Sequence, residues 1–456
     1  MIFPFGLGRH CRKMIWHRPL RRWIPIRNHW KHCENRFCLW ERDICIECTR
    51  ESMSPLESYA PIVHSSVISE LAFLAEKLKG KRIVHVFDEC SVNPAYKITL
   101  RMETLFTCIG LNVQCDNVAL DKEQTARIKK INRILNGAID AVSREEWRNI
   151  NEIFEHFPHA IDLEREIIMV HDLLCLGLIR HRHSHRWIWE YSGNMANPDP
   201  DIWNNLRAYA HGYDASVFAS PLLCPETEIP RFIIPPSLDP YSDLSKELTE
   251  DILNNILQSM QIDCERPLIT QVTAFDSMTD LIGVIDAFRL SRSYCRSQLL
   301  IVGSTEMHSV QEQVLARVKE KAGTDPDIVI HALPPGNDVT INALQRASTL
   351  ILHRLKQPEF DMTVGHALWK SKPVIANAVG GTPQLITHKY SGILTHTVEG
   401  MAYWIKELLH APEFAKRLGE NGKEHIRQNF LVIRQMRDYM LLWMALDHKQ
   451  DITSFS

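Results

Sequence analysis

The first 52 residues contain the side chains whose types and spacing come closest to those of a metal site. Thiolate and imidazole groups at short spacing suit a tetrahedral zinc ion. This stretch supplies them at Cys33, Cys38, Cys45, Cys48, His29 and His32. Cys45 and Cys48 have the CxxC spacing and the other cysteines do not, so zinc is one hypothesis among several.

The same stretch is basic and rich in tryptophan. It carries eleven Lys or Arg against five acidic residues, with Trp16, Trp23, Trp30 and Trp40 between them, and it shows no sustained helical or strand period. Basic residues interleaved with Trp also suit an RNA-stacking arm. An unstructured extension and translation that begins at Met53 are the remaining alternatives.

Two further histidine positions could bind a ligand. The run Arg180–Arg186 has His181, His183 and His185 at alternate positions, which indicates either a metal site or a solvated basic loop. His171-Asp172 closes the apolar run Ile167–His171. A histidine there either approaches a ligand at the end of a strand or hydrogen-bonds to the backbone.

Backbone N–H groups can also bind ligands where glycines allow close approach. Gly380-Gly381-Thr382 offers such a loop, although a Gly pair between a strand and a helix also forms ordinary turns. Ser237 and Asp239 have the residue types of turn caps, and we interpret them as linker caps rather than ligands.

Composition limits the class of protein. The 456 residues are 45% hydrophobic and 23% charged, with a formal charge of −3, which predicts two or three folded domains and no global field for nucleic acid or membrane. No apolar run approaches the roughly 18 residues of a membrane span. After residue 50 the cysteines occur singly, which favours reduced thiols in a cytoplasm.

These residues need a scaffold, and apolar strands that alternate with helical spacing predict one. In the first half we expect strands at 82–87, 111–115, 167–171 and 187–191, and helices at 67–78, 100–109 and 122–135. In the second half we expect strands at 268–272, 298–302, 328–332, 349–353, 373–376 and 392–394, and helices at 245–258, 279–290, 309–322, 338–347, 363–369, 398–409, 411–429 and 432–446. The proline-rich segment Phe232–Pro240 is the predicted linker, because paired prolines remove donors and favour an extended connection.

The alternation predicts an α/β protein of two Rossmann-like domains that face each other across a cleft. We expect the extension at 1–52, an N-terminal domain at 53–238, a C-terminal domain at 239–430 and, at 431–456, a helix that packs back on the N-terminal domain. The methionines and leucines of 432–446 indicate core packing, with a dimerisation stripe as the alternative.

From about Met53 onward the chain resembles the trehalose glycosyltransferring synthases, also called trehalose synthase or phosphorylase, of glycosyltransferase family 4. The segments that carry the resemblance are Tyr59–Val63, Leu74–Arg82, Val170–Asp172, Trp187–Trp189, Ile234–Pro240, Gly283–Phe288, Asn342–Ser348, Ala367–Ile375 and Val379–Gly381. The resemblance implies a GT-B fold, with an acceptor-side N-terminal domain and a donor-side C-terminal domain. It also implies retaining transfer of glucose from a nucleotide donor to glucose, which makes trehalose with no metal and no cofactor.

The resemblance also shows where this chain departs from the family. The family places an Arg and a Lys after the first strand of the C-terminal domain, where cations stabilise the departing diphosphate; Ala274 and Thr279 occupy these positions here. The family's two Glu residues, which grip the donor sugar and the ribose, are replaced by Pro358 and His366. Glu359, one residue later, could compensate for the first.

The N-terminal domain departs as well. The family's glycine-rich turn is Asp88–Lys97 here and contains no glycine, and Glu190 reverses the charge of a patch where the family carries Arg and His. By resemblance, His171 remains as the residue that approaches the sugar and so is the catalytic candidate. The substrate-binding candidates are Asp172, Gly380, Gly381 and Thr382.

The favoured hypothesis is therefore a noncatalytic or weakly active homologue that acts as a scaffold, as a partner of an active paralogue or as a sugar sensor. The alternative is an active retaining transferase that takes glucose from UDP- or ADP-glucose to glucose and forms trehalose. A transfer that needs no diphosphate donor, such as phosphorolysis, and a gene product without function complete the set. Neither main hypothesis involves nucleic acid or a membrane.

Overall fold

The computed structural model describes residues 54–88, 94–118, 120–135, 142–155, 165–183, 185–292, 296–305 and 309–447. Hypotheses on the cysteines, histidines and tryptophans of residues 1–52 lie outside these residues, as do 89–93 of the expected glycine-free turn. Among the helices of the described residues, none is both long enough and apolar enough to cross a bilayer.

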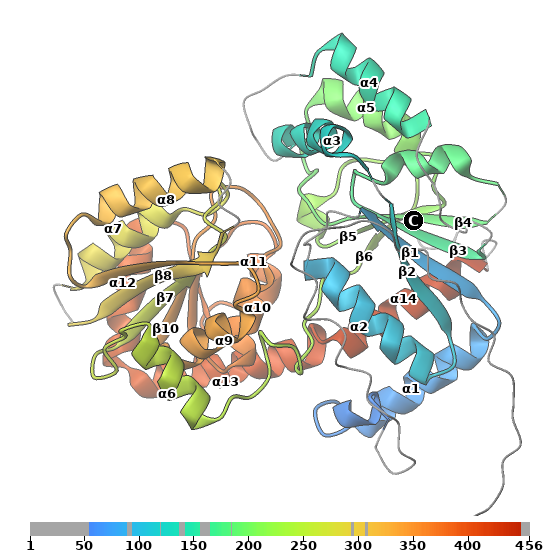
Figure 1. Cartoon of the computed structure of the whole chain (residues 1–456). Coiled ribbons are helices and arrows are strands. Elements are labelled where there is room, and N and C mark those ends of the chain that lie inside the picture. Colours follow the sequence, from blue (N-terminus) through green and yellow to red (C-terminus); the bar gives the residue numbers. More distant parts are fainter. Residues whose placement is uncertain are drawn as a thin grey trace, which may run out of the picture. The chain divides into compact units, whose positions relative to one another are not determined.

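The first lobe is built on a parallel sheet (Figure 1). Its strands are β1 (Arg82–Asp88), β2 (Asn112–Val118), β3 (Ile167–His171), β4 (Arg186–Tyr191), β5 (Ala215–Phe218) and β6 (Arg231–Ile233), in the spatial order β2-β1-β3-β4-β5-β6. The helices are α1 (Ser65–Lys77), α2 (Pro94–Cys108), α3 (Lys122–Leu135), α4 (Arg144–Glu155) and α5 (Pro200–Ala210). Alternate residues of β3 pack into different cores, so both faces of the sheet are covered.

The second lobe repeats this plan (Figure 1). Its strands are β7 (Leu268–Val272), β8 (Gln298–Ser304), β9 (Ile328–Leu333), β10 (Leu350–His353), β11 (Val374–Asn377) and β12 (Ile393–Thr395), in the order β12-β11-β10-β7-β8-β9 and parallel throughout the described pairs. The helices are α6 (Glu250–Ser259), α7 (Leu281–Arg292), α8 (Ser309–Ala322), α9 (Asp338–Ala347), α10 (Met362–Trp369), α11 (Thr382–Leu385), α12 (Val398–His410) and α13 (Pro412–Asn429). The predicted pair of Rossmann-like α/β lobes is confirmed.

The helix α14 (Val432–Asp447) belongs to the core of the first lobe. Trp443 is fully buried; its ring centroid lies 5.3 Å from that of Phe106 on α2, and its indole N–H donates to Met169 Sδ on β3 at 3.2 Å. Met436 and Met440 share this core with residues of α1. The side chains of the last helix thus pack into the core on one face of the first sheet.

Several predicted boundaries are wrong, among them the start of α2, which begins at Pro94 rather than at residue 100, and two of them have a visible local reason. The linker does not begin at Phe232, because Arg231–Ile233 pairs with β5 as strand β6. Helix α6 does not begin at Ser245, because Thr249 caps it by accepting from the backbone N–H of Ile252. The carbonyls of Ser245 and Lys246 are instead taken by the guanidinium of Arg346.

Candidate functional site

The loop that joins β7 to α7 carries acids and no bases. Residues 273–280 include Asp276 and Asp280, and neither Ala274, which is exposed, nor Thr279, which is buried, can supply charge. Asp276 Oδ1 accepts from the backbone N–H groups of Met278 at 2.9 Å and Thr279 at 3.1 Å, and from Thr279 Oγ1 at 3.2 Å. The side chain of Thr279 therefore helps to fix a carboxylate in a tight turn.

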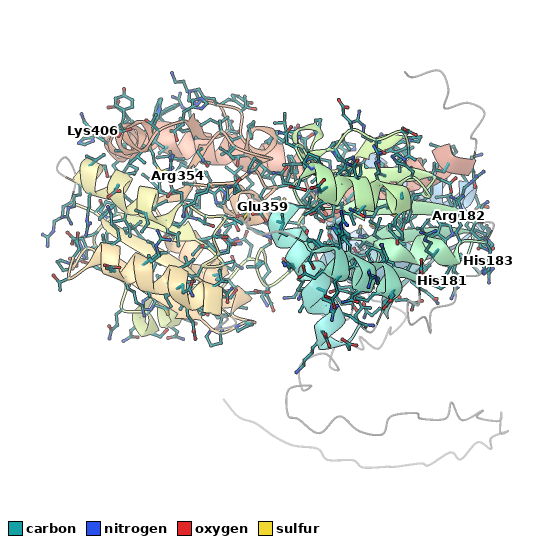
Figure 2. All side chains as sticks on the ribbon, turned by 90° about the horizontal axis from the view of Figure 1, so that it is seen from above. His181, Arg182, His183, Arg354, Glu359 and Lys406 are labelled. Atoms are coloured by element: carbon teal, nitrogen blue, oxygen red, sulfur yellow. The ribbon has the colours of Figure 1, made fainter. Side chains whose placement is uncertain are left out.

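Asp280 and Arg354 form an ion pair at the start of α7. Asp280 Oδ1 accepts from the backbone N–H of Gly283 at 3.1 Å, and Oδ2 accepts from Arg354 Nε at 2.7 Å. A Cβ at Gly283 would lie 2.4 Å from Asp280 Oδ2 and 2.8 Å from Arg354 Nε, so only glycine leaves room for this pair. The guanidinium of Arg354, whose side chain is labelled in Figure 2, is thereby held at the helix by the carboxylate of Asp280.

Glu359, Gly380 and Gly381, separated in sequence, meet at the ends of β10 and β11. Gly381 N–H donates to the carbonyl of Glu359 at 2.8 Å. Gly380 has φ +59°, and a Cβ there would lie 2.2 Å from that same oxygen, so the backbone of Glu359 needs a glycine in the left-handed region. Thr382 is buried as the first residue of α11.

An acidic cluster, which we define as Asp276, Glu359 and Asp361, lies beside His353. Burial, and then the charges of Asp361 and Asp276, raise the pKa of Glu359 to about 8. Asp361 Oδ1 caps α10 by accepting from Thr363 N–H at 2.8 Å, and its Oδ2 lies 3.5 Å from His353 Nε2. His353 is 1% exposed, and burial lowers its pKa. Carboxylates thus outnumber cations in this part of the lobe.

The two positions expected to have lost a Glu differ in environment. His366 Nδ1 and Ser245 Oγ share a hydrogen bond of 2.9 Å. Burial and then the charge of Lys370 lower the pKa of His366 to about 3, so its imidazole is neutral at physiological pH. Pro358 is half-buried and has no backbone N–H.

Three polar residues of the resemblance segments serve the scaffold. Asn342 Nδ2 donates to the carbonyls of Asp243 and Lys246 at 2.9 and 2.8 Å. Arg346 donates to the carbonyl of Ser245, and Lys370 Nζ donates to that of Leu244 at 2.6 Å. Together these side chains hold the segment 243–246 against α9 and α10.

In the first lobe, His171 is a buried member of a polar network. It is 4% exposed, its Nε2 shares a hydrogen bond of 2.9 Å with His85 Nδ1, and its ring stacks on Phe87 at 3.9 Å between centroids. Its Nδ1 lies 3.7 Å from Glu190 Oε2. Burial lowers the pKa of both histidines, so they are neutral together.

The network continues from Glu190 to α14. Tyr439 O–H donates to the Glu190 carboxyl at 2.8 Å and accepts from Gln435 Nε2 at 3.0 Å, and Gln435 Oε1 accepts from Ser237 Oγ at 2.5 Å. Burial is the main cause that raises the pKa of Glu190 to about 8. Glu190 is therefore an interior acid, and the charge reversal expected at this position involves a group that is mostly uncharged near pH 7.

The other predicted residues of the first lobe take structural positions. Asp172 has φ +60°, and its backbone N–H donates to the Glu190 carbonyl at 2.8 Å. Asp239 Oδ1 accepts from Tyr59 O–H at 2.7 Å and from the backbone N–H of Tyr241 at 3.0 Å, as a linker cap would.

An ion pair ties the histidine run before β4 to the residue that precedes β5. Figure 2 labels its side chains His181, Arg182 and His183, and Arg182 Nη2 pairs with Asp214 Oδ2 at 2.7 Å. Among the residues that the structure describes, no three His, Cys, Asp or Glu side chains are placed to share a metal ion.

Sequence reasoning did not assign a role to His85, His353, Arg354, Tyr439 or Asp276. One signal was available for His353-Arg354 and Asp276, because each follows a parallel strand, and ligands of α/β sheets bind at the carboxyl ends of strands. His85 and Tyr439 offered no such signal, since they lie within apolar stretches.

Comparison with known proteins agrees with the fold. The structure of the UDP-forming α,α-trehalose-phosphate synthase of Burkholderia xenovorans superimposes with a TM-score of 0.62 at 14% identity, over 81% of this chain and 99% of that one. The family profile "Glycosyl transferases group 1" matches residues 254–425. The fold is therefore GT-B, the two-lobe α/β fold of glycosyltransferases.

Sequence similarity defines the family. The profile "Trehalose synthase, N-terminal domain" matches residues 97–224. The chain is 31% identical over 406 residues to the trehalose synthase of Rubrobacter xylanophilus, covering 86% of this chain and 97% of the relative. It is 30% identical over 396 residues to that of Pyrococcus horikoshii, covering 84% and 95%. The chain belongs to the trehalose synthase family.

Proposed function

We propose that this protein is a trehalose synthase-family member that transfers glucose from nucleotide sugars weakly or not at all, and that it acts as a scaffold, as a partner of an active paralogue or as a sugar sensor. The observation that carries the proposal is the acidic cluster. Asp276 lies in the loop where, by resemblance, cations would neutralise the donor diphosphate, while Ala274 and Thr279 bring no charge.

The electrostatics of the second lobe oppose a diphosphate. Loss of a group that stabilises developing charge commonly costs about 10²-fold or more in rate, and carboxylates in place of cations add repulsion. Burial is the main cause that raises the pKa of Glu359 to about 8, and the charges of Asp361 and Asp276 raise it further. Arg354, the cation on the neighbouring loop, is paired with Asp280 through Nε, while its buried Nη1 has no hydrogen-bond partner within the described residues. A neutral sugar would meet no such repulsion.

One observation favours the alternative of an active, trehalose-forming transferase. Glu359 lies against Gly380 and Gly381, which by resemblance form the sugar loop, so its carboxyl could replace the one lost at Pro358. In that case UDP- or ADP-glucose would be the donor and His171 would contact the reacting sugar. The two candidates differ in whether a nucleotide sugar binds.

Isothermal titration of the full chain with UDP, UDP-glucose, ADP-glucose, glucose and trehalose separates the candidates. We expect no nucleotide binding up to about 1 mM, which corresponds to about −4 kcal/mol. Binding near 1 μM, about −8 kcal/mol, or trehalose formation from labelled UDP-glucose would refute the noncatalytic proposal and establish the enzyme.

A gain-of-charge variant tests the stated cause. Ala274→Arg combined with Asp276→Asn adds a cation at an exposed position and removes a carboxylate while keeping the acceptor Oδ1 of the turn. We expect UDP affinity to rise at least about 10-fold, since the two substitutions together make the local charge more positive by two units. Asp251→Asn, at an exposed site on α6, is the matched control and should leave UDP affinity unchanged.

We also propose that the protein is cytoplasmic. Cys108, Cys115, Cys175, Cys224 and Cys264 are free thiols, as expected in a reducing compartment. Co-purification with an active trehalose synthase from the native host would support the partner role, whereas a chain that elutes alone and binds sugars would favour the sensor role.

A further inference from the structure

His353 is a buried polar side chain without a hydrogen-bond partner. Neither ring nitrogen forms a hydrogen bond within the described residues, although the side chain is 1% exposed at the end of β10. Its Nε2 points toward Asp361 Oδ2 at 3.5 Å, which is longer than a hydrogen bond. Buried polar groups are nearly always satisfied, so an unpaired imidazole indicates a missing donor or acceptor.

The acidic cluster beside His353 has unused acceptors. Asp276 Oδ1 accepts the turn hydrogen bonds and leaves Oδ2 free, and Asp361 uses Oδ1 for the cap of α10. The Glu359 carboxyl forms no hydrogen bond with the described residues. Ionised carboxylates only accept, and a neutral imidazole offers one acceptor nitrogen. With a pKa of about 8, Glu359 holds a proton near pH 7, so the cluster has more acceptors than donors and its members carry no positive charge; a cationic ligand would displace the Glu359 proton.

Two of the three carboxyl groups are held by hydrogen bonds, and the backbone that carries the third is fixed. Asp276 is fixed by the N–H groups of its turn, Asp361 by the start of α10, and the backbone of Glu359 by Gly381 N–H. Electrostatic repulsion among fixed carboxylates is relieved either by protonation or by a cationic ligand. In the described residues these acids are not arranged as a metal site.

We propose that the acidic cluster and His353 bind the protonated amino group of an amino sugar. An ammonium group supplies three N–H donors and one positive charge, which match the free oxygens of Asp276, Glu359 and Asp361 and the acceptor nitrogen of His353. The sugar part of the ligand rests on the proposed function, which gives this lobe a sugar-binding role without a diphosphate.

Isothermal titration of the full chain with D-glucosamine, glucose and N-acetylglucosamine tests the charge requirement. These three sugars share a ring, and only glucosamine carries an ammonium group. We expect glucosamine to bind at least 10-fold more tightly than either neutral sugar. Equal affinities for the three, or no glucosamine binding by a folded protein, would overturn the inference.

Isosteric variants assign the binding to the cluster. Glu359→Gln should weaken glucosamine binding at least 10-fold and leave the neutral sugars unchanged, whereas Glu399→Gln, at an exposed position on α12, should change neither. Asp361→Asn keeps a capping oxygen for α10 and serves if Glu359→Gln unfolds. Unchanged glucosamine affinity in a folded cluster variant would place the amine elsewhere and overturn the inference.

Two parallel titrations separate the remaining explanations. Binding of MgCl₂ or CaCl₂ by a folded protein that binds no glucosamine would make the cluster an inorganic cation site and overturn the inference. UDP-glucose binding would refute the proposed function. If the folded protein binds neither UDP-glucose nor glucosamine, the amino-sugar inference is refuted and the proposed function still stands.

Discussion

Replacement of the interior acid Glu190 by Gln should change how the stability of the protein depends on pH. The Glu190 carboxyl is about 12% exposed, accepts a hydrogen bond from Tyr439 O–H and has neutral His171 beside it. Burial raises its pKa from 4.5 to about 8. In the unfolded chain the same group titrates near 4.5.

The sign and size of this change in the free energy of unfolding follow from the number of protons bound by the folded and unfolded states. Between pH 4.5 and about 8 the folded state keeps a proton that the unfolded chain has released, so the free energy of unfolding falls as pH rises. Each pH unit costs about 1.4 kcal/mol, and the whole window therefore costs up to about 5 kcal/mol. Gln keeps the carbonyl acceptor for Tyr439 and has no proton to lose.

Urea unfolding at half-unit steps from pH 5 to pH 9 measures the effect. We expect the variant and the natural protein to unfold with similar free energies at pH 5, and the variant to be more stable by several kcal/mol at pH 9. Glu228→Gln, whose side chain is 88% exposed, is the control and should follow the natural protein. Parallel curves for Glu190→Gln and the natural protein would show that Glu190 is ionised in the folded state, and would refute the reasoning.

Two further substitutions test the scaffold of the second lobe. Gly380→Ala places a Cβ 2.2 Å from the Glu359 carbonyl oxygen at φ +59°, so we expect the free energy of unfolding in urea to fall by about 2 kcal/mol or more. The control Gly80→Ala is also at positive φ but has open space around it, and its free energy of unfolding should fall by about 1 kcal/mol. Equal losses for the two variants would argue against the close approach at Gly380. Lys370→Met leaves three acceptors without their donor, namely the carbonyls of Leu244 and His366 and Gln345 Oε1. We expect its free energy of unfolding to fall by about 2–3 kcal/mol, whereas Lys416→Met, at an exposed position, should be nearly neutral. Equal urea midpoints for the two Lys variants would contradict the role of Lys370 in holding the segment 243–246.

The resemblance to a known family predicted the family correctly, and the local hydrophobic pattern predicted most of the fold. Strands β3 and β7 and helices α3, α8 and α9 have the predicted bounds, because a buried parallel strand is a continuous apolar run and a helix has its own period and end signals. Helices α4 and α5 and strands β5 and β6 were not predicted. The strands are short, whereas Trp147, Ile150 and Phe154 of α4 have helical spacing, so the sequence did carry a signal for that helix. The start of α6 depended on Arg346, a residue about 100 positions away in the chain.

For the candidate site too, some features could be predicted from the sequence and others needed the tertiary structure. The sequence by itself was enough to predict that Ala274, Thr279, Pro358 and His366 occupy positions where the resemblance implies charge, because that comparison needs only residue types in order. The tertiary structure alone placed Asp276 with Glu359 and Asp361, left His353 without a partner, and buried Glu190 against Tyr439. Charge and burial depend on distances between segments far apart in the chain, and a pKa or an unsatisfied hydrogen bond exists only once those segments have packed together.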